Sequence, residues 1–316
     1  MITTTYDHLF GPVPSRRLGV SLGIDLVPHK TCNLNCIYCE CGRTTWLTME
    51  RDEYVALEQV REELTHFMAA QPAPDYLTLS GAGEPLLNSR AGELIAWMKN
   101  SFPDVPVAVL TNGTLFSNAD VRQAVQRADV VLPSLDAATQ PVFHDINRPH
   151  RALDIAAVIE GLVELRHEFS GKIWLEVFIA PGLNDHEQEL TALRQAIIRI
   201  HPDRVQLNTL DRPGTEADLG SATRAQLKHI IDFWQLPNTE IIARVQRTSA
   251  HRGVRQEKMA AILETISRRP CTVEDLTQVL NLPIQEVNKY LGILEKEQQI
   301  QQRRQGAMAF YERKRN

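Results

Sequence analysis

The chain has 316 residues, of which 43% are hydrophobic and 23% charged, an ordinary balance for a globular protein with room for one large and one small domain. No apolar run approaches the roughly 20 residues of a membrane helix, and the N-terminus MITTTYDHLF lacks the pattern of a signal peptide, so we expect a cytoplasmic protein with no membrane partner. The net charge of −5 gives no general argument for nucleic-acid binding. From Arg252 onward, however, 12 Lys and Arg face 8 Asp and Glu, and this uneven charge predicts two domains, residues 1–250 and 251–316.

Strand and helix patterns alternate along the first domain. Apolar, β-branched runs predict strands at 22–28, 76–81, 107–113, 130–136, 173–180 and 204–210. Helical patterns lie at 52–70, 88–101, 118–128, 151–168, 185–200 and 221–234. This alternation favours a parallel sheet covered by helices, either barrel-like or open and doubly wound. Ahead of the first strand, Pro12 and Pro14 predict extended chain, with Arg16 and Arg17 either over the site or on the surface.

The run CNLNCIYCEC, which follows the first predicted strand, contains three cysteines at the spacing C-x3-C-x2-C and a fourth, Cys41, at its end. The first three are Cys32, Cys36 and Cys39, and Tyr38 precedes the third. Thiolates this close together on one loop can bind three irons of a [4Fe–4S] cluster. The fourth iron then remains open to a ligand that is not protein.

The two remaining cysteines, Cys41 and Cys271, bear on the alternatives to a single iron–sulfur cluster. Zinc is one alternative, since Cys41 offers a fourth ligand and His29 lies nearby. A disulfide is disfavoured because cytosolic thiols stay reduced. Cys41 and Cys271 are too few for a second cluster held by cysteines, so the chain needs an external electron donor, of the flavodoxin or ferredoxin type.

Glycines and polar residues follow the second and third strands, at the edge where parallel sheets bind ligands. In SGAGEP, Gly81 and Gly83 let the backbone approach a ligand closely, and Glu84 offers a carboxylate. Alone, this motif is also an ordinary turn. Asn112 follows the third strand in an Asn-Gly pair that is itself a common turn, so its place in the site rests on position.

The fourth strand ends in SLDA and is followed by HDINRPH. Ser134 and Asp136 offer a hydroxyl and a carboxylate at the ligand edge, although Asp136 is equally suited to cap the next segment. The guanidinium of Arg148 matches a carboxylate or phosphate bidentately. A solvated arginine is the alternative. Beyond the sixth strand, Asp211 and Arg212 lie at the same edge.

The segment from about residue 254 has a different character. It predicts a helix that ends at Pro270, a second helix with Thr272 as N-cap and Asp275 at its third position, a third helix, and a hairpin with its turn at Gly306. This order resembles a small winged helix-turn-helix domain. Such units read DNA, or serve as docking modules for protein or peptide. The third helix is not basic, so both uses stay open.

The cysteine spacing, with its aromatic residue, resembles the signature of the radical S-adenosylmethionine (SAM) superfamily. The resemblance implies an α/β fold with a partial (β/α)6 barrel, one [4Fe–4S] cluster held by the three cysteines, and SAM at the open iron. Reductive cleavage of SAM would give a 5′-deoxyadenosyl radical. GAGE resembles the glycine-rich GGE element of the superfamily, with Ala82 replacing its first glycine, which implies that Gly83 and Glu84 help to hold the methionine end of SAM.

The resemblance also implies that Ser134 and Asp136 bond the ribose of SAM and that Arg148 holds its carboxylate. The cofactor-binding residues expected in this way are Tyr38, Gly81, Gly83, Glu84, Asn112, Ser134, Asp136 and Arg148. Further motifs, including GPVPSRRLG, INRPH and LNTLDRP, are similar to the wyosine-synthase-like Fe–S oxidoreductases over residues 8–215. The chain lacks the cysteines of their second cluster, so the wyosine reaction itself is not implied.

We therefore expect a radical SAM enzyme, an Fe–S oxidoreductase or an RNA- or peptide-modifying enzyme, that abstracts hydrogen from a macromolecule. An RNA or tRNA base and a peptide or protein both fit as substrate, presented with the help of the C-terminal domain. The alternative is an iron–sulfur sensor whose winged helix regulates transcription. It would show cluster-dependent, salt-sensitive DNA binding and no SAM turnover. No residue identifies the group that carries out catalysis on the substrate.

Overall fold

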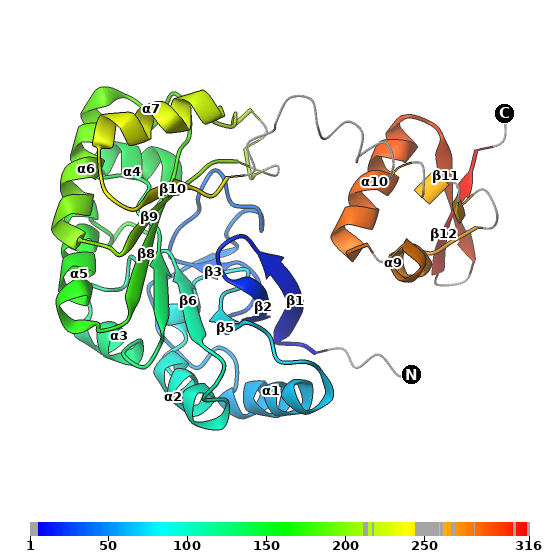
Figure 1. Cartoon of the computed structure of the whole chain (residues 1–316), viewed down its shortest axis with the longest axis horizontal. Coiled ribbons are helices and arrows are strands. Elements are labelled where there is room, and N and C mark those ends of the chain that lie inside the picture. The colour runs from blue at the N-terminus through cyan, green and yellow to red at the C-terminus, as the bar shows by residue number, and fades with distance from the viewer. Residues whose placement is uncertain are drawn as a thin grey trace. The chain divides into compact units, whose positions relative to one another are not determined.

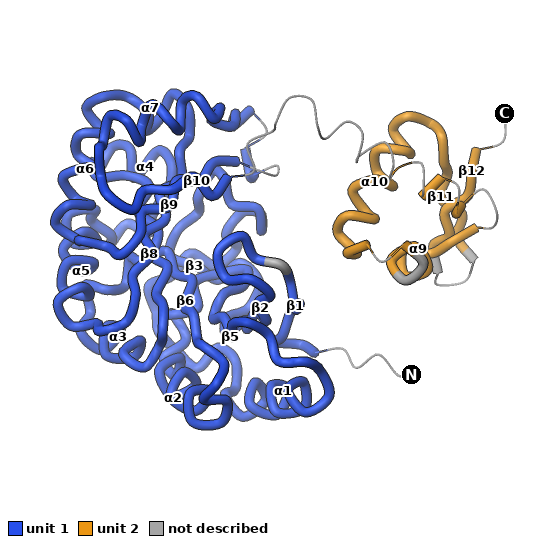
Figure 2. Tube along the Cα trace, viewed as in Figure 1, with its two compact units in different colours: residues 1–245 blue, residues 246–316 orange. Residues whose placement is uncertain are grey.

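The structure is a computed structural model, and it divides the chain into two compact units, Met1–Val245 and Gln246–Asn316 (Figure 2). Each unit has its own cluster of buried apolar side chains. The expected boundary between residues 250 and 251 lies outside the described residues. The structure describes residues 6–210, 214–216, 218–243, 259, 262–263, 265–266, 270–280, 282–305 and 308–314.

An eight-stranded sheet forms the centre of the first unit, in the order β1-β2-β5-β6-β7-β8-β9-β10 (Figure 1). From β2 to β10 all neighbours are parallel, whereas β1 is antiparallel to β2. The predicted α/β fold with a mostly parallel sheet is confirmed. Each predicted strand overlaps an observed one, although β2 ends at Ile24 and not at residue 28. The strands are β1 (Leu9–Ser15), β2 (Gly19–Ile24), β5 (Tyr76–Leu79), β6 (Val107–Thr111), β7 (Val130–Pro133), β8 (Lys172–Phe178), β9 (Arg204–Asn208) and β10 (Thr239–Ile241).

Helices connect the strands and lie along the outer side of the sheet in Figure 1. Sequence reasoning missed α4, a short helix that has a proline, Pro141, in its first turn and no side-chain cap. Within the ranges described, no helix combines the length and hydropathy needed to cross a membrane. The helical elements are α1 (Leu57–Ala70), η1 (Pro85–Leu87), α2 (Ala91–Ser101), α3 (Ala119–Ala124), α4 (Gln140–Asn147), α5 (Ile155–Glu168), α6 (Glu187–Ile200) and α7 (Arg224–Trp234).

The turn between β1 and β2 connects distant strands of the sheet. Leu18 of this turn packs in a small apolar cluster with residues of β6, β7 and β8. Arg17 forms an ion pair with Glu176 of β8, and Arg16 Nη1 donates to the carbonyl of Ile242, just after β10, at 2.8 Å. The sequence analysis left open whether Arg16 and Arg17 lie over the site or on the surface. In the structure both arginines connect the turn before β2 with the opposite end of the sheet, at β8 and after β10.

The described part of the second unit contains two helices and a pair of antiparallel strands. These are α9 (Val273–Leu280), α10 (Ile284–Lys296), β11 (Ile300–Gln305) and β12 (Met308–Arg313). The predicted cap is confirmed, because Asp275 N donates to Thr272 Oγ1 at 3.1 Å while Thr272 N donates to Asp275 Oδ2 at 2.8 Å. Most of the helix expected before Pro270, and the turn at Gly306, lie outside the described residues. The winged-helix assignment stays a prediction.

Candidate functional site

The three cysteines lie on the loop that follows β2, the cluster loop, taken here as residues 28–48. Cys32 ends the two-residue strand β3 (Thr31–Cys32), which pairs in parallel with β4 (Trp46–Leu47). A turn hydrogen bond from Cys39 N to Cys36 O, at 3.3 Å, closes the other end of the motif. All three thiols are free and partly buried. The spacing in the sequence therefore becomes one folded loop with its thiols turned inward.

Each of the three thiols faces one side-chain N–H donor. Hydrogen bonds to cluster sulfurs favour the anionic sulfur, so this donor set fits an iron–sulfur site. Asn112 Nδ2 lies 3.6 Å from Cys32 Sγ, Asn147 Nδ2 lies 3.4 Å from Cys36 Sγ, and Lys30 Nζ lies 3.0 Å from Cys39 Sγ.

Burial controls the ionisation of these thiols in the protein alone. It raises the pKa of Cys32 to about 11 and raises the pKa of Cys36 further. Hydrogen bonding from the Cys41 thiol, together with Lys30, holds the pKa of Cys39 below its ordinary value. Two of the three thiols therefore need a strong positive partner, such as iron, to be thiolates at neutral pH.

The grouping of donors also bears on the zinc alternative. Among the residues that the structure describes, no three Cys, His, Asp or Glu side chains are grouped so that they hold one metal ion. A zinc site needs its ligands around a single ion, whereas each thiolate of a [4Fe–4S] site binds a different iron. The described residues thus contain no preformed group of zinc ligands.

The GAGE turn packs directly on the cluster loop. Lys30 N donates to Ala82 O at 2.9 Å, and Glu84 N donates to Thr31 O at 3.1 Å. A Cβ on Gly83 would lie well under 3.0 Å from Thr31 O, a contact that real side chains do not make. Gly83 therefore allows a close approach, as predicted, but the group that approaches in this structure is the backbone of the cluster loop.

Gly81 is required for a different reason. Its φ of +137° is a conformation that side chains rarely adopt, and its Cα faces the carboxylate of Asp25. Asp25 Oδ2 accepts from Ala82 N at 3.3 Å, whereas Oδ1 is buried without a hydrogen-bond partner. Burial also raises the pKa of Asp25. Sequence reasoning missed Asp25, because it lies inside the run predicted as a strand at 22–28, whereas β2 ends at Ile24.

Glu84 is turned into the protein, with only 1% of its surface exposed. Its carboxylate accepts from Thr111 Oγ1 and from Asn112 N, both at 2.7 Å, and from Leu86 N at 3.0 Å. Burial raises its pKa to about 7. Glu84 thus fixes the end of β6 relative to the GAGE turn, and Asn112 is the side chain that it places beside Cys32.

Asn112 belongs to a polar network with two residues that sequence reasoning missed. Its Nδ2 donates to Asn33 Oδ1 at 2.6 Å, and its Oδ1 accepts from Thr114 Oγ1 at 2.6 Å. Asn33 Nδ2 closes the ring by donating to Thr114 Oγ1 at 2.7 Å. The Asn-Gly pair is therefore a turn that also holds the cluster loop.

Asp136 links three elements and is only 3% exposed. It accepts from Asn147 Nδ2 of α4 at 2.8 Å, from Phe178 N of β8 at 2.9 Å, and from the Tyr38 hydroxyl. The ring of Tyr38 stacks on Phe178 with centroids 3.9 Å apart. Burial raises the pKa of Asp136 to about 6. The capping alternative for Asp136 is wrong, because none of these donors opens the following helix.

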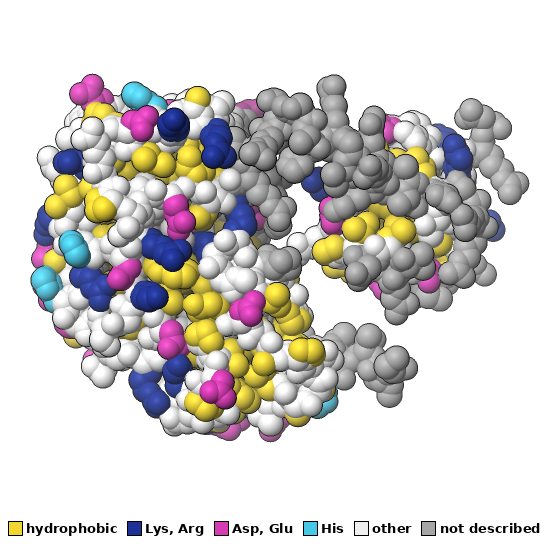
Figure 3. Space-filling model, in the orientation of Figure 1, with side chains coloured by type: hydrophobic (Ala, Val, Ile, Leu, Met, Phe, Trp, Pro, Cys, Tyr) yellow, Lys and Arg dark blue, Asp and Glu magenta, His cyan; other side chains and the backbone are white. Residues whose placement is uncertain are grey.

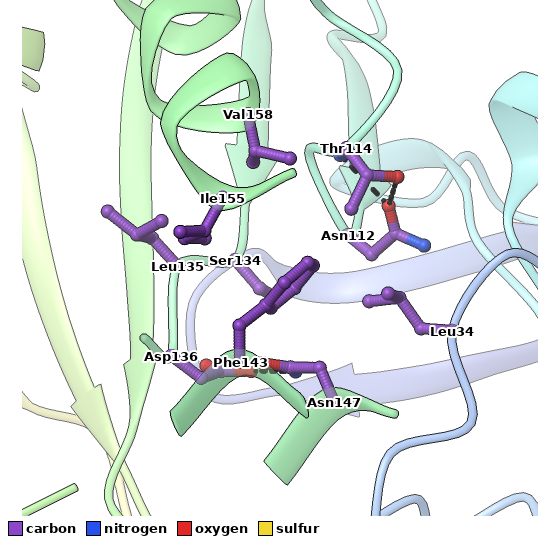
Figure 4. Close-up of a pocket in the computed structure, with 10 residues that line it drawn as sticks. All are labelled: Leu34, Asn112, Thr114, Ser134, Leu135, Asp136, Phe143, Asn147, Ile155 and Val158. Atoms are coloured by element: carbon purple, nitrogen blue, oxygen red, sulfur yellow. Dashed lines mark hydrogen bonds between the residues drawn. The ribbon is translucent and has the colours of Figure 1, made fainter. Parts of the chain in front are cut away.

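A cavity at the carboxyl ends of β6 and β7 joins these groups (Figure 4). In the close-up, Asp136 and Asn147 lie together beneath Phe143, while Asn112 and Thr114 lie at the other side. Ser134 reaches the same cavity, as its place at the ligand edge predicted. The full lining comprises Leu34, Asn112, Thr114, Ser134, Leu135, Asp136, Phe143, Asn147, Ile155 and Val158.

Arg148 does not line this cavity. Its Nη1 lies 2.6 Å from Glu216 Oε1, and Glu216 N donates to Ile37 O of the cluster loop at 3.1 Å. The loop after β9 thus holds the cluster loop through Glu216, which the sequence did not indicate. Asp211 and Arg212, expected at this edge, lie outside the described residues.

Comparison with known proteins agrees with this geometry. Residues 26–193 match the model of the Radical SAM superfamily. The chain belongs to this superfamily. Proteins with this fold bind a [4Fe–4S] cluster and SAM, which agrees with the cofactors inferred from the cysteine motif.

Relatives cover different shares of the chain. A UPF0026 protein of Helicobacter pylori strain J99 is 32% identical over 311 residues, covering 96% of each chain. A protein named GTPase Obg from Brachyspira hyodysenteriae is 40% identical over 205 residues, which are 65% of this chain and only 30% of that protein. Among solved structures, a radical SAM methyltransferase from Sphaerobacter thermophilus shares the fold, with a TM-score of 0.54 and 17% identity over 72% of this chain and 66% of that one.

Proposed function

We propose that this protein is a radical SAM enzyme in which Cys32, Cys36 and Cys39 hold a [4Fe–4S] cluster and SAM binds at the open iron. The observation that supports this most strongly is that each of the three thiols has its own N–H donor in the folded loop. When bound, the cluster and SAM supply one-electron cleavage chemistry that leads to hydrogen abstraction from a substrate. The protein supplies orientation and exclusion of water.

The protein's own residues divide these tasks. Asn112 and Asn147 donate to thiol sulfurs, and Glu84 and Asp136 hold the elements that carry these donors. We assign Gly81, Gly83 and Ser134 to direct contact with SAM, through the backbone of the turn and through the hydroxyl. Tyr38, Glu84, Asn112 and Asp136 then act by placing the loop around the cofactor.

Arg148 is assigned to the carboxylate of SAM, which requires an exchange of partners. In the structure its guanidinium is paired with Glu216. Both groups are partly exposed, and such ion pairs contribute little net stability, so a ligand carboxylate can replace Glu216 at low cost. Opening this pair would also loosen the loop after β9 when SAM binds.

The substrate that we propose is a macromolecule, an RNA base or a polypeptide, presented with the help of the second unit. On its β11–β12 hairpin, Arg303 and Arg304 are exposed, whereas α10 exposes Ile284 at 48%. The face of the first unit seen in Figure 3 mixes Lys and Arg with Asp and Glu and offers no one-signed surface of its own. We further propose a cytoplasmic location and a flavodoxin- or ferredoxin-type donor.

The test is anaerobic reconstitution of the cluster, followed by SAM and a strong reductant. We expect a brown protein that releases 5′-deoxyadenosine and methionine. Cys36→Ala should lose both properties, while Cys41→Ala, on the same loop, should keep them. Retention of colour or SAM cleavage by Cys36→Ala refutes the assignment. An intact cluster without cleavage, combined with cluster-dependent DNA binding, would favour the sensor alternative.

A further inference from the structure

Lys30 is a buried cation whose backbone is fixed on both sides. Its side chain is only 4% exposed, and its φ of +61° is unusual for a residue with a side chain. Its N–H donates to Ala82 O at 2.9 Å, while its carbonyl accepts from Thr45 N at 3.1 Å and from Trp46 N at 3.2 Å. The GAGE turn and the returning strand of the cluster loop therefore hold this residue in one conformation.

The ammonium of Lys30 points at the cysteines. Nζ lies 3.0 Å from Cys39 Sγ, and its charge also acts on Cys32 and Cys41. Among the described residues, no carboxylate lies at ion-pair distance from Lys30. A buried ammonium without a carboxylate is costly unless another anion compensates it. The thiolates of the loop are the anions available.

We propose that Lys30 compensates the charge of the cluster and raises its reduction potential; this rests on the proposed function. Reduction adds one electron, and so one negative charge, to a site already surrounded by three thiolates. The potential of such clusters depends on net charge, on hydrogen bonds to the sulfurs and on burial. A fixed ammonium at Cys39 Sγ therefore favours the reduced state, and it determines how readily a one-electron donor can load the site. Because Lys30 is buried, this role does not compete with substrate contact.

The experiment is a redox titration of the reconstituted full-length protein, with the reduced cluster followed by electron paramagnetic resonance. Lys30→Met removes the charge and keeps the length, Lys30→Gln keeps a weaker donor, and Lys30→Arg keeps the charge. Lys99→Met is the matched control, because Lys99 lies on α2 and pairs with Asp129, just before β7, away from the cluster loop. At the wild-type midpoint, the ratio of reduced to oxidised cluster should fall at least tenfold in Lys30→Met, which is about 59 mV for a one-electron couple. Lys30→Arg and Lys99→Met should stay within twofold of the wild type.

A Lys30→Met cluster that titrates with the wild type overturns the inference and leaves the proposed function intact. If Lys30→Met binds no iron, Lys30→Gln is titrated instead, and an unchanged potential there overturns it equally. If the cluster assembles in Lys30→Arg but in neither Lys30→Met nor Lys30→Gln, the result supports charge compensation. Failure of all three variants to assemble overturns it in favour of a steric role. A wild-type protein that binds no cluster would instead refute the proposed function.

Discussion

Replacing Gly83 by alanine tests whether the GAGE turn and the cluster loop form one unit. The added Cβ would lie well under 3.0 Å from Thr31 O and 2.7 Å from Val27 Cγ2. The first neighbour is backbone, and it is held in place by the hydrogen bonds Lys30 N to Ala82 O and Glu84 N to Thr31 O. The turn and the loop must therefore move apart by roughly an ångström before this contact reaches 3.0 Å.

Two costs add in this variant. Overpacking of one methyl group costs about 1–3 kcal/mol, and a weakened backbone hydrogen bond costs about 0.5–1.5 kcal/mol. We therefore expect Gly83→Ala to lower the free energy of unfolding by about 1.5–4.5 kcal/mol, measured by urea denaturation of the apoprotein. Binding of SAM to the reconstituted protein should weaken at least tenfold. Gly220→Ala is the control, because a Cβ there meets no atom within 4 Å, and it should change stability by less than about 0.5 kcal/mol. If Gly83→Ala matches Gly220→Ala in both measurements, the close contact has no energetic consequence and the reasoning is wrong.

Three further predictions concern single side chains. Burial raises the pKa of Glu84 from 4.5 to about 7. Between pH 4.5 and about 7 the native state therefore binds more protons than the unfolded chain, so the free energy of unfolding should fall as the pH rises through this range. Glu84→Gln should reduce that slope in urea titrations at several pH values, and an unchanged slope would contradict the assignment. Asn147→Ala leaves Asp136 without one buried donor and should cost about 1–3 kcal/mol of apoprotein stability, together with lower iron content after reconstitution. Thr272→Ala removes the cap of α9 and should lower the stability of the second unit by about 0.5–2 kcal/mol, seen by calorimetry of the full chain, with SAM cleavage unchanged.

The fold and the general position of the site could be predicted because both depend on local patterns. Alternating apolar runs gave the strands of the parallel sheet, and the carboxyl ends of parallel strands meet at one edge. Motifs at those ends, such as the residues around Glu84, Asn112 and Asp136, were therefore expected to gather, and they do. The short helix α4 was missed because eight residues without a side-chain cap give little periodic signal.

Contacts between distant residues were not predictable in the same way. Arg148 and Glu216 are 68 positions apart, and Arg17 and Glu176 are 159 apart. Nothing in either local sequence specifies its partner, since pairing depends on how far each loop extends over the sheet. The same holds for Lys30, whose neighbours in sequence give no indication that its ammonium meets Cys39.

Glu84 and Asp136, the two buried carboxylates of the site, are better placed to position neighbouring residues than to contact SAM directly. Glu84 and Asp136 both use their oxygens on donors within the protein, and burial raises the pKa of each. A carboxylate that is already satisfied in this way gains little from a new ligand, because binding the ligand would leave a buried donor unpaired. Their effect on SAM is therefore expected through position: Glu84 places Asn112 beside Cys32, and Asp136 places Asn147 beside Cys36. Substituting Glu84 or Asp136 should therefore lower the iron content after reconstitution more than it lowers the affinity of the assembled site for SAM. Measuring iron content and SAM affinity on the same variant distinguishes a positioning role from direct contact with SAM.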